Sequence, residues 1–260
     1  MKPPVVVHIP HASMRVPDAA PTLALAPHEL EAELLAMTDH YTDELFTLPE
    51  SVAKMVRFPV SRLVVDPERF TDDAHEPMAA RGMGVIYTQT SDHRRLRAKP
   101  TPAERAALLS RFYEPHHRAL TEGVSDALAA HGACLLLDGH SFPSKPLPYE
   151  NDQREDRPDV CIGTDGFHTP AWLRDAAVAE FEREGLRVAV DRPFEGALVP
   201  MAFYRSNARV MAVMVELNRA RYLHERTGEK RDEFVEFRER VHGVLRRVVE
   251  VWLREVARYG

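Results

Sequence analysis

The segment ACLLLDGHSFPS, residues 133–144, joins an unbroken apolar run to a group of polar side chains. Residues 133–137 are all apolar, which is typical of a central strand that is buried on both faces of a sheet. The polar residues Asp138, His140 and Ser141 come directly after this run. The segment therefore predicts a core strand that carries candidate functional groups at its carboxyl end.

Two more segments share this design, VVVHIPHAS at residues 5–13 and VMAVMVELNRAR at residues 210–221. Their polar residues are His11, Ser13, Glu216, Asn218 and Arg219. A lone polar residue after a strand more often serves a turn, but the carboxyl ends of strands form the ligand crevice of open α/β sheets. Because the pattern occurs three times, we expect the three groups to converge. Glu216 interrupts an apolar run, and the cost of an unpaired buried carboxylate indicates a cation or a site there.

Short apolar runs alternate with longer helical patterns along the chain, which indicates an α/β layer architecture. Strands are expected at residues 4–10, 60–65, 85–88, 133–137, 186–190 and 210–217. Helices are expected at residues 27–48, 101–131, 171–184 and 231–256. The polar, proline-rich residues 143–159 are interpreted as a surface loop, so that residues 1–260 form a single domain.

The helix expected at residues 101–131 has clear start and stop signals. Thr101 is a candidate N-cap, and Glu104 completes a capping box with it. Gly132 follows the last turn as a stop signal. Pro115 lies inside the pattern, and because proline lacks a backbone N–H group, we expect a kink or a break there.

The composition argues against several classes of protein. The chain has 34 Lys and Arg against 40 Asp and Glu, a net charge of −6, whereas a nucleic-acid binder needs a basic face. No segment approaches the ~20 apolar residues that span a bilayer, and none is typical of a signal peptide. Two cysteines, Cys134 and Cys161, form no disulfide framework. We expect a cytoplasmic protein that binds neither nucleic acid nor membrane.

Two further segments carry charged candidates. In the helix expected at residues 27–48, Asp39 and Asp43 are four residues apart on one face, where a metal or an arginine could offset their repulsion. A solvated helix face is the plainer interpretation. In SRLVVDPERFTDD, Arg62 and Arg69 flank Asp66, and their planar guanidinium groups suit carboxylates. A surface cluster of salt bridges is the alternative for this segment.

The order of several segments points to a known family. They are HIPHASMRVP, MTDHYTDELF, SRLVVDPERFTDD, RFYEPHHRAL, HGACLLLDGHSFPS, PDVCIGTDG and VMVELNRARYL. Together they resemble the motifs of the N-formylglutamate amidohydrolases over residues 5–223. The chain departs from the family pattern at Ala12, where serine is usual, at Met14, and at Glu68, where asparagine is usual.

This resemblance implies a fold like that of the zinc exopeptidases, a three-layer αβα sandwich around a mixed sheet. It also implies a divalent metal ion, zinc in the first place, with His11 and His140 as ligands and Glu216 as the general base. The exopeptidase carboxylate ligand has no counterpart here, because Met14 stands at its position. Asp39 is our candidate for the third ligand, with Asp43 as the second choice.

The resemblance also suggests roles around the metal. Asp138 would hydrogen-bond the far nitrogen of a ligand histidine and fix its tautomer. Arg69, together with Arg62, would bind the carboxylates of the substrate. Further candidates for substrate contact are Ser13, His117, Thr164 and Asn218.

The implied reaction is the hydrolysis of N-formyl-L-glutamate, or of a related N-acyl amino acid, to formate and L-glutamate, the last step of one route of histidine degradation. The metal would activate water and polarise the carbonyl group. A metallopeptidase or deacylase with a larger substrate is the alternative enzyme, and a binding protein without activity is the alternative of another class. A serine hydrolase that uses Ser13 or Ser141 is disfavoured, because the sequence has no G-x-S-x-G motif.

Overall fold

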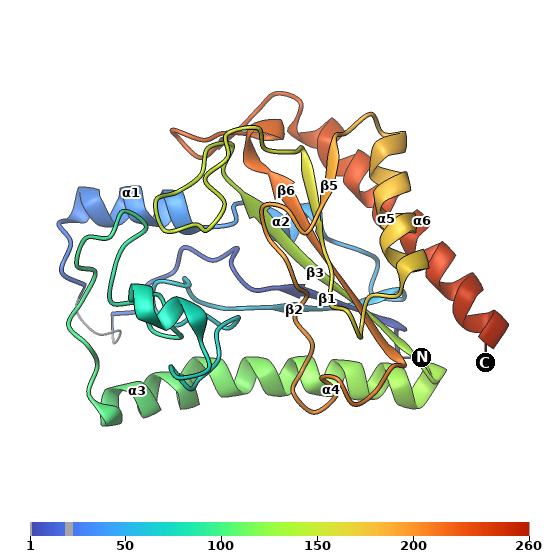
Figure 1. Ribbon diagram of the computed structural model, residues 1–260, viewed down its shortest axis with the longest axis horizontal. Helices are drawn as coiled ribbons and strands as arrows, with labels where there is room; N and C mark the ends of the chain where they lie inside the picture. The colour runs from blue at the N-terminus through green and yellow to red at the C-terminus, as the bar shows by residue number, and fades with distance from the viewer. Residues whose placement is uncertain (1, 19–22, 260) are drawn as a thin grey trace.

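A six-stranded sheet forms the centre of the computed structural model, which describes residues 2–18 and 23–259 (Figure 1). The strands are β1 (Val5–Ile9), β2 (Ala53–Arg57), β3 (Cys134–Phe142), β4 (Val160–Gly163), β5 (Val188–Val190) and β6 (Val210–Asn218). Their order in the sheet is β2-β1-β3-β6-β4-β5. Only the β4–β6 pair is antiparallel among these neighbours, so the sheet is mixed.

Helices cover both faces of this sheet. The long helix α4 (Glu114–His131) packs under β1, β2 and β3, at the bottom of Figure 1. On the opposite face lie α2 (Thr42–Leu45), α5 (Ala171–Arg183) and α6 (Phe234–Tyr259). The inner side of α6 buries Phe237, Val241, Val244, Leu245, Val248 and Trp252. The predicted three-layer αβα sandwich is therefore confirmed.

The two-residue alternation of the strands decides which side chains face α4. Cys134 and Leu136 of β3 lie in the apolar cluster beneath the sheet, together with Leu120 and Val124 of α4. The next residues of β3 on that face are Asp138 and His140. In the register, His8 of β1 is paired with Asp138, and Glu216 of β6 is paired with His140. Four polar side chains of three neighbouring strands thus share one face.

The chain from residue 101 to 131 is continuous, with a local change of helix type. It consists of α3 (Pro102–Leu108), the π-helical turn η2 (Leu109–Tyr113) and α4. The capping box of Thr101 with Glu104 is present, and Gly132 ends α4 with a φ angle of 71°. Of the kink or break expected at Pro115, a break is not found, because the chain stays helical through a wider π turn that precedes the residue without an N–H group.

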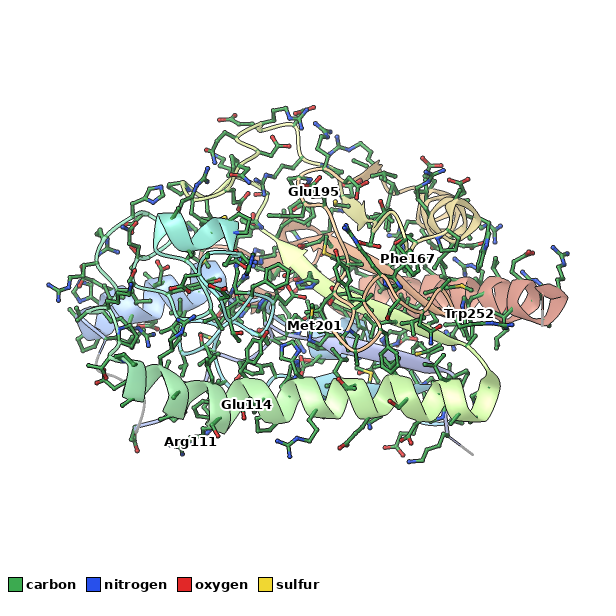
Figure 2. All side chains as sticks on the ribbon, turned by 60° about the horizontal axis from the view of Figure 1, so that its bottom comes forward. Arg111, Glu114, Phe167, Glu195, Met201 and Trp252 are labelled. Carbon is green, nitrogen blue, oxygen red and sulfur yellow. The ribbon has the colours of Figure 1, made fainter. Side chains whose placement is uncertain are left out.

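The outer and inner sides of this long helix differ as its pattern requires. Arg111 and Glu114 lie on the outer side, where both are exposed (Figure 2). Phe112 and His116 are buried on the inner side. A histidine of α4 is thereby placed directly beneath the polar end of the sheet.

The single helix expected at residues 27–48 was wrong. The structure has α1 (Pro27–Met37) and the short α2, and Tyr41 between them has a φ angle of 62°. Asp39 lies in this interruption, where its N–H group donates to the carbonyl of His11 at 3.0 Å. Asp39 and Asp43 therefore do not share a helix face, because a hydrogen bond to the end of β1 draws the chain out of the helix.

Two expected strands were also wrong. Residues 60–65 form turns, and residues 85–88 have no regular strand. Their apolar side chains are nevertheless buried, in a local cluster with Phe58, Leu108 and Phe112. Apolar composition there reflects packing between loops and the start of the long helix. The real strand of this region, β2, contains Lys54 and Arg57 and was missed because it lies at the sheet edge.

The remaining elements are short. They are the 3-10 helices η1 (Pro77–Arg81) and η3 (Arg219–Arg221) and the hairpin β7 (Leu223–His224) and β8 (Glu229–Lys230). Strand β4 was not expected from the sequence, whereas residues 143–159 form a loop, as predicted. Within the described ranges, no helix combines the length and the apolar character needed to cross a membrane.

Gly139 gives a test of how closely the layers pack. A Cβ atom at this position would lie 2.7 Å from Cγ of Phe46 and 3.0 Å from Cδ1 of Ile9. We expect Gly139→Ala to lower the free energy of unfolding by about 1–3 kcal/mol, because the added methyl group overpacks the core. Urea unfolding measures this, with Gly166→Ala as the control, since a Cβ atom there meets no described atom within 4 Å. Equal losses in the two variants would contradict the expectation.

Candidate active site

A cavity of about 900 Å³ opens at the carboxyl ends of β1, β3 and β6. One wall comes from the loop at residues 143–159. The predicted site residues that line it are His11, Asp39, Arg62, Arg69, His140 and Glu216. The three polar strand ends of the sequence therefore converge on one space, as expected for an open α/β sheet.

His11, Asp39 and His140 form a group that could hold a metal ion. Oδ2 of Asp39 lies 3.6 Å from Nδ1 of His11 and 3.2 Å from Nδ1 of His140. Ligand atoms on a tetrahedral zinc ion, each about 2.0–2.1 Å from the metal, are about 3.3 Å apart. The three side chains thus have the spacing of ligands to one small cation.

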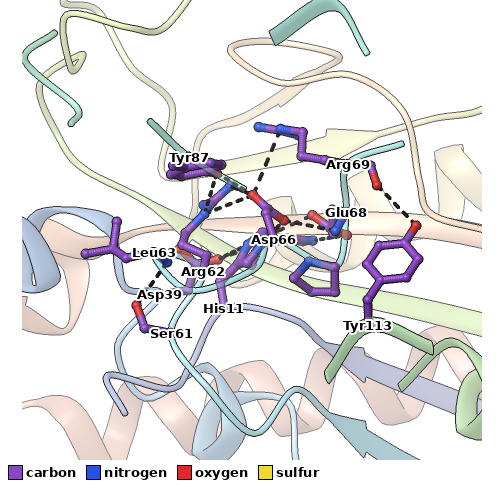
Figure 3. A network of polar contacts seen from close by, with 12 residues as sticks. His11, Asp39, Ser61, Arg62, Leu63, Asp66, Glu68, Arg69, Tyr87 and Tyr113 are labelled. Atoms are coloured by element: carbon purple, nitrogen blue, oxygen red, sulfur yellow. Dashed lines mark hydrogen bonds and ion pairs between the residues drawn. The ribbon is translucent and has the colours of Figure 1, made fainter. Parts of the chain in front are cut away.

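The orientation of His11 also fits a metal. Its Nε2 contacts Oδ1 of Asp66 at 2.9 Å, and Asp66 is in turn bound by Arg62 at 2.8 Å (Figure 3). Burial would raise the pKa of Asp66, but the charges of Arg62 and His11 hold it well below its usual range. Nδ1 of His11 is buried and has no hydrogen-bond partner within residues 2–18 and 23–259. A carboxylate behind the far nitrogen and an unpaired near nitrogen are typical of a metal-binding histidine.

His140 also has a carboxylate behind its far nitrogen, and its near nitrogen is hydrogen-bonded to Asp39. Its Nε2 lies 3.0 Å from Oδ1 of Asp138, while its Nδ1 faces Asp39. Burial would raise the pKa of Asp138, but the contacts with His140 and His8 hold it well below its usual range. Asp138 accepts a further hydrogen bond from the N–H group of Leu198, which fixes its carboxylate. The predicted role of Asp138 in orienting a ligand histidine agrees with this geometry.

Arg219 holds Asp39 in place. Its Nη2 donates to Oδ1 of Asp39 at 2.9 Å, and its other nitrogens donate to the carbonyl of Ala36 and to Oγ of Ser141. Burial would raise the pKa of Asp39, but the nearby histidines and Arg219 keep it well below its usual range. Arg219 thus leaves Oδ2 of Asp39 directed at the histidines. Ser141, on β3, accepts a hydrogen bond from Arg219 and so helps to clamp Asp39 in this orientation.

Glu216 lies beside the histidines, buried at the end of β6. It is 7% exposed, and its Oε2 makes no hydrogen bond within the described part of the chain. Burial raises the pKa of Glu216 to about 8. A carboxylate whose pKa is shifted by burial, in a cavity next to a candidate metal group, is a typical general base.

The two arginines are engaged to different extents. Arg62 donates to Asp66 and to the hydroxyl of Tyr87, so its guanidinium group is largely occupied. Arg69 lines the cavity, and its Nε is 3.9 Å from the nearest oxygens of Asp66 and Glu76. Its backbone carbonyl accepts a hydrogen bond from Tyr113 (Figure 3). Arg69 is therefore the better placed of the two to bind an anionic substrate.

Four predicted substrate contacts lie away from this cavity. Ser13, His117, Thr164 and Asn218 are not among the described residues that line it. Each instead makes a hydrogen bond: Ser13 to the carbonyl of Pro59, His117 to that of Pro67, Thr164 to Asp191, and Asn218 to the carbonyl of Pro158. These bonds join segments next to the site that are far apart in the sequence. Asp43, the second choice for the third ligand, faces Arg57 at 3.8 Å and is likewise outside.

Three site residues were missed from the sequence. His8 is buried beside Asp138, His116 contacts His8 from α4, and Glu68 reaches toward all three histidines of the sheet. His8 could have been found from the sequence, because it is a histidine inside the apolar run of residues 5–9. Glu68 was noted only as a departure from a motif, since nothing local to it indicates its direction.

Comparison with known proteins identifies the family. A model of the N-formylglutamate amidohydrolases matches residues 3–223. The chain belongs to this family. The N-formylglutamate amidohydrolase of Ralstonia eutropha JMP134 has a similar structure, with a TM-score of 0.83, 24% identity, and coverage of 97% of this chain and 95% of that one. A gene product of Agrobacterium tumefaciens is similar with a TM-score of 0.68 and 22% identity over 94% and 91% of the chains. No curated protein that was compared matches the sequence.

Membership of the N-formylglutamate amidohydrolase family confirms the resemblance expected over residues 5–223. The two solved structures support the fold at this level of identity. The roles of individual site residues stay predictions, and they are based on the geometry of this chain.

Arg219 allows a direct test of the clamp on Asp39. In Arg219→Lys a single ammonium group cannot bond Asp39, Ser141 and the carbonyl of Ala36 together. We expect zinc affinity to fall about 10–100-fold, the usual effect of losing a residue that orients a ligand. Competition with a colorimetric chelator measures this. Arg221→Lys, in the same 3-10 turn but 45% exposed, is the control and should bind zinc as the wild type does. Unchanged affinity in Arg219→Lys would refute the clamp.

Proposed function

We propose that this chain hydrolyses N-formyl-L-glutamate to formate and L-glutamate with the help of a divalent metal ion, most simply zinc. The observation that carries the proposal is the buried Glu216, whose Oε2 has no hydrogen-bond partner among the described residues, beside the group of His11, Asp39 and His140. Family membership supports the substrate. We further expect the enzyme to act in the cytoplasm and in histidine degradation, as the sequence analysis predicted.

The donor set fits zinc, because two imidazole nitrogens and one carboxylate oxygen are a usual set for a catalytic site. When bound, the ion supplies a Lewis acid that polarises the scissile carbonyl and makes water more acidic. His11 and His140 must be neutral to bind it, and the hydrogen bonds to Asp66 and Asp138 direct their remaining protons away from the metal.

Glu216 is the group that moves protons in this proposal. In the protein alone, burial favours its protonated form, since its pKa is about 8. A nearby cation favours the carboxylate, so the loaded protein has a base ready next to the attacking water. Glu216 accepts the proton of this water and then donates it to the nitrogen that leaves with glutamate. Arg69 orients the substrate by binding a carboxylate.

A larger N-acyl or peptide substrate is a second candidate, and the cavity volume favours it. Pockets for drug-sized ligands have about 300–1,000 Å³, and this cavity of about 900 Å³ is near the upper end of that range. N-formylglutamate is smaller than such ligands. The loop at residues 143–159 lines the additional space.

The proposed reaction is tested by assay of the purified chain with N-formyl-L-glutamate, N-formyl-L-aspartate and N-acetyl-L-glutamate. We expect the highest kcat/KM with N-formyl-L-glutamate, loss of activity after removal of metal with a chelator, and recovery when zinc is restored. Larger N-acyl amino acids and N-acyl dipeptides, assayed in parallel, test the second candidate. Hydrolysis that is insensitive to the chelator would contradict a metal-assisted reaction.

The base is tested with Glu216→Gln. The amide has the size of the carboxylate but accepts no proton, so we expect kcat to fall about 10²–10⁴-fold. Zinc content should be unchanged, because Glu216 is outside the ligand group. Glu182→Gln, on the exposed side of α5, is the matched control and should keep full activity. Glu216 is not the base if the two variants have the same kcat.

A further inference from the structure

A second group of metal-competent side chains lies next to the first. His8, Glu68 and Asp138 offer one nitrogen and two oxygens that are within 4.8 Å of one another. We propose that they bind a second divalent cation, and that Glu68 bridges it to the ion at His11, Asp39 and His140. This goes beyond the proposed function, because it concerns the number of ions that the site holds and not the substrate.

The spacing of the second group suits a single ion. Nδ1 of His8 lies 2.9 Å from Oδ1 of Asp138 and 3.7 Å from Oε1 of Glu68. These distances bracket the separation of about 3.3 Å between ligands of a tetrahedral zinc ion. A cation here would replace the proton that His8 and Asp138 now share.

Glu68 is placed to serve both groups. Its Oε2 makes the closest approach to Nδ1 of His11, at 3.9 Å. Its Oε1 instead makes the closest approaches to Nδ1 of His8, at 3.7 Å, and to Nε2 of His140, at 3.2 Å. Oε2 is thus turned toward the first group, whereas Oε1 lies between His140 of the first group and His8 of the second. Such a bridge fits two metal ions about 3.5–4 Å apart.

Neighbouring groups orient the ligand atoms of His8 and Asp138. Nε2 of His8 lies 2.8 Å from Nε2 of His116. Once Nδ1 of His8 binds a cation, the remaining ring proton of His8, on Nε2, can be donated to His116. Burial lowers the pKa of His116 to about 2, and the neutral ring is able to accept this bond. The second oxygen of Asp138 is occupied by the N–H group of Leu198, which directs Oδ1 to the site.

Oδ1 of Asp138 has two lone pairs, and the proposal uses both. One accepts the hydrogen bond from Nε2 of His140, at 3.0 Å, and the other faces His8. The second ion therefore does not displace Asp138 from its contact with the first group.

The test counts the ions bound by the full chain. The metal-depleted protein is titrated with zinc in a calorimeter, and its zinc content is measured after desalting. We expect two ions per chain for the wild type and one for His8→Asn and for Glu68→Gln. His117→Asn, whose side chain contacts the carbonyl of Pro67 outside the cavity, is the control and should retain two. Crystals grown with zinc should show two anomalous peaks about 3.5–4 Å apart.

One ion per chain in an active wild type would overturn the second site and leave the proposed function standing. Two ions in Glu68→Gln would overturn the bridge. If His8→Asn does not fold, Glu68→Gln decides, because the Glu68 side chain is 14% exposed and tolerates an amide of equal size. A wild type that binds no zinc but hydrolyses N-formyl-L-glutamate would overturn both metal groups and keep the substrate assignment.

Discussion

The pairing of β3 with β1 on one side and with β6 on the other determines where the candidate functional groups lie. His8 meets Asp138 in one pair and His140 meets Glu216 in the other, so the register brings together residues that are far apart in the sequence. A shift of β3 by one residue would turn Asp138 and His140 to the opposite face, away from His8 and Glu216. The apolar runs that fix this register, such as Val5–Ile9, are therefore as important to the site as its polar residues.

Much of the fold and part of the site could be predicted from the sequence. Apolar runs placed β1, β3 and β6, and the capping box placed the start of the long helix, because these signals are local. The interruption at Asp39 could not be predicted, since it depends on a hydrogen bond to His11 in another element. Likewise, Val64 and Val65 are buried without a strand partner, and no sequence pattern distinguishes this from a strand.

The sequence distinguished polar residues of the site from polar residues with a structural role only where a carboxylate or a histidine lies within an apolar strand. Glu216 and His140 met that condition and line the cavity, whereas Asn218 and Thr164 bind neighbouring segments of the chain beside it. His8 met the same condition and was overlooked. Asparagine and threonine stabilise turns through the same polar atoms that would bind a ligand, so their identity alone does not discriminate.

The loop at residues 143–159 starts directly after β3, the strand that carries His140, and is held by Arg157, which binds Glu150 and lies over the ring of Phe142. The loop is therefore anchored on β3, the strand that carries His140, while residues 143–159 themselves contain no strand or helix. Insertions or deletions between these anchors would reshape the entrance without displacing the histidines. Such a division lets the range of accepted molecules diverge between relatives while the reactive centre stays the same.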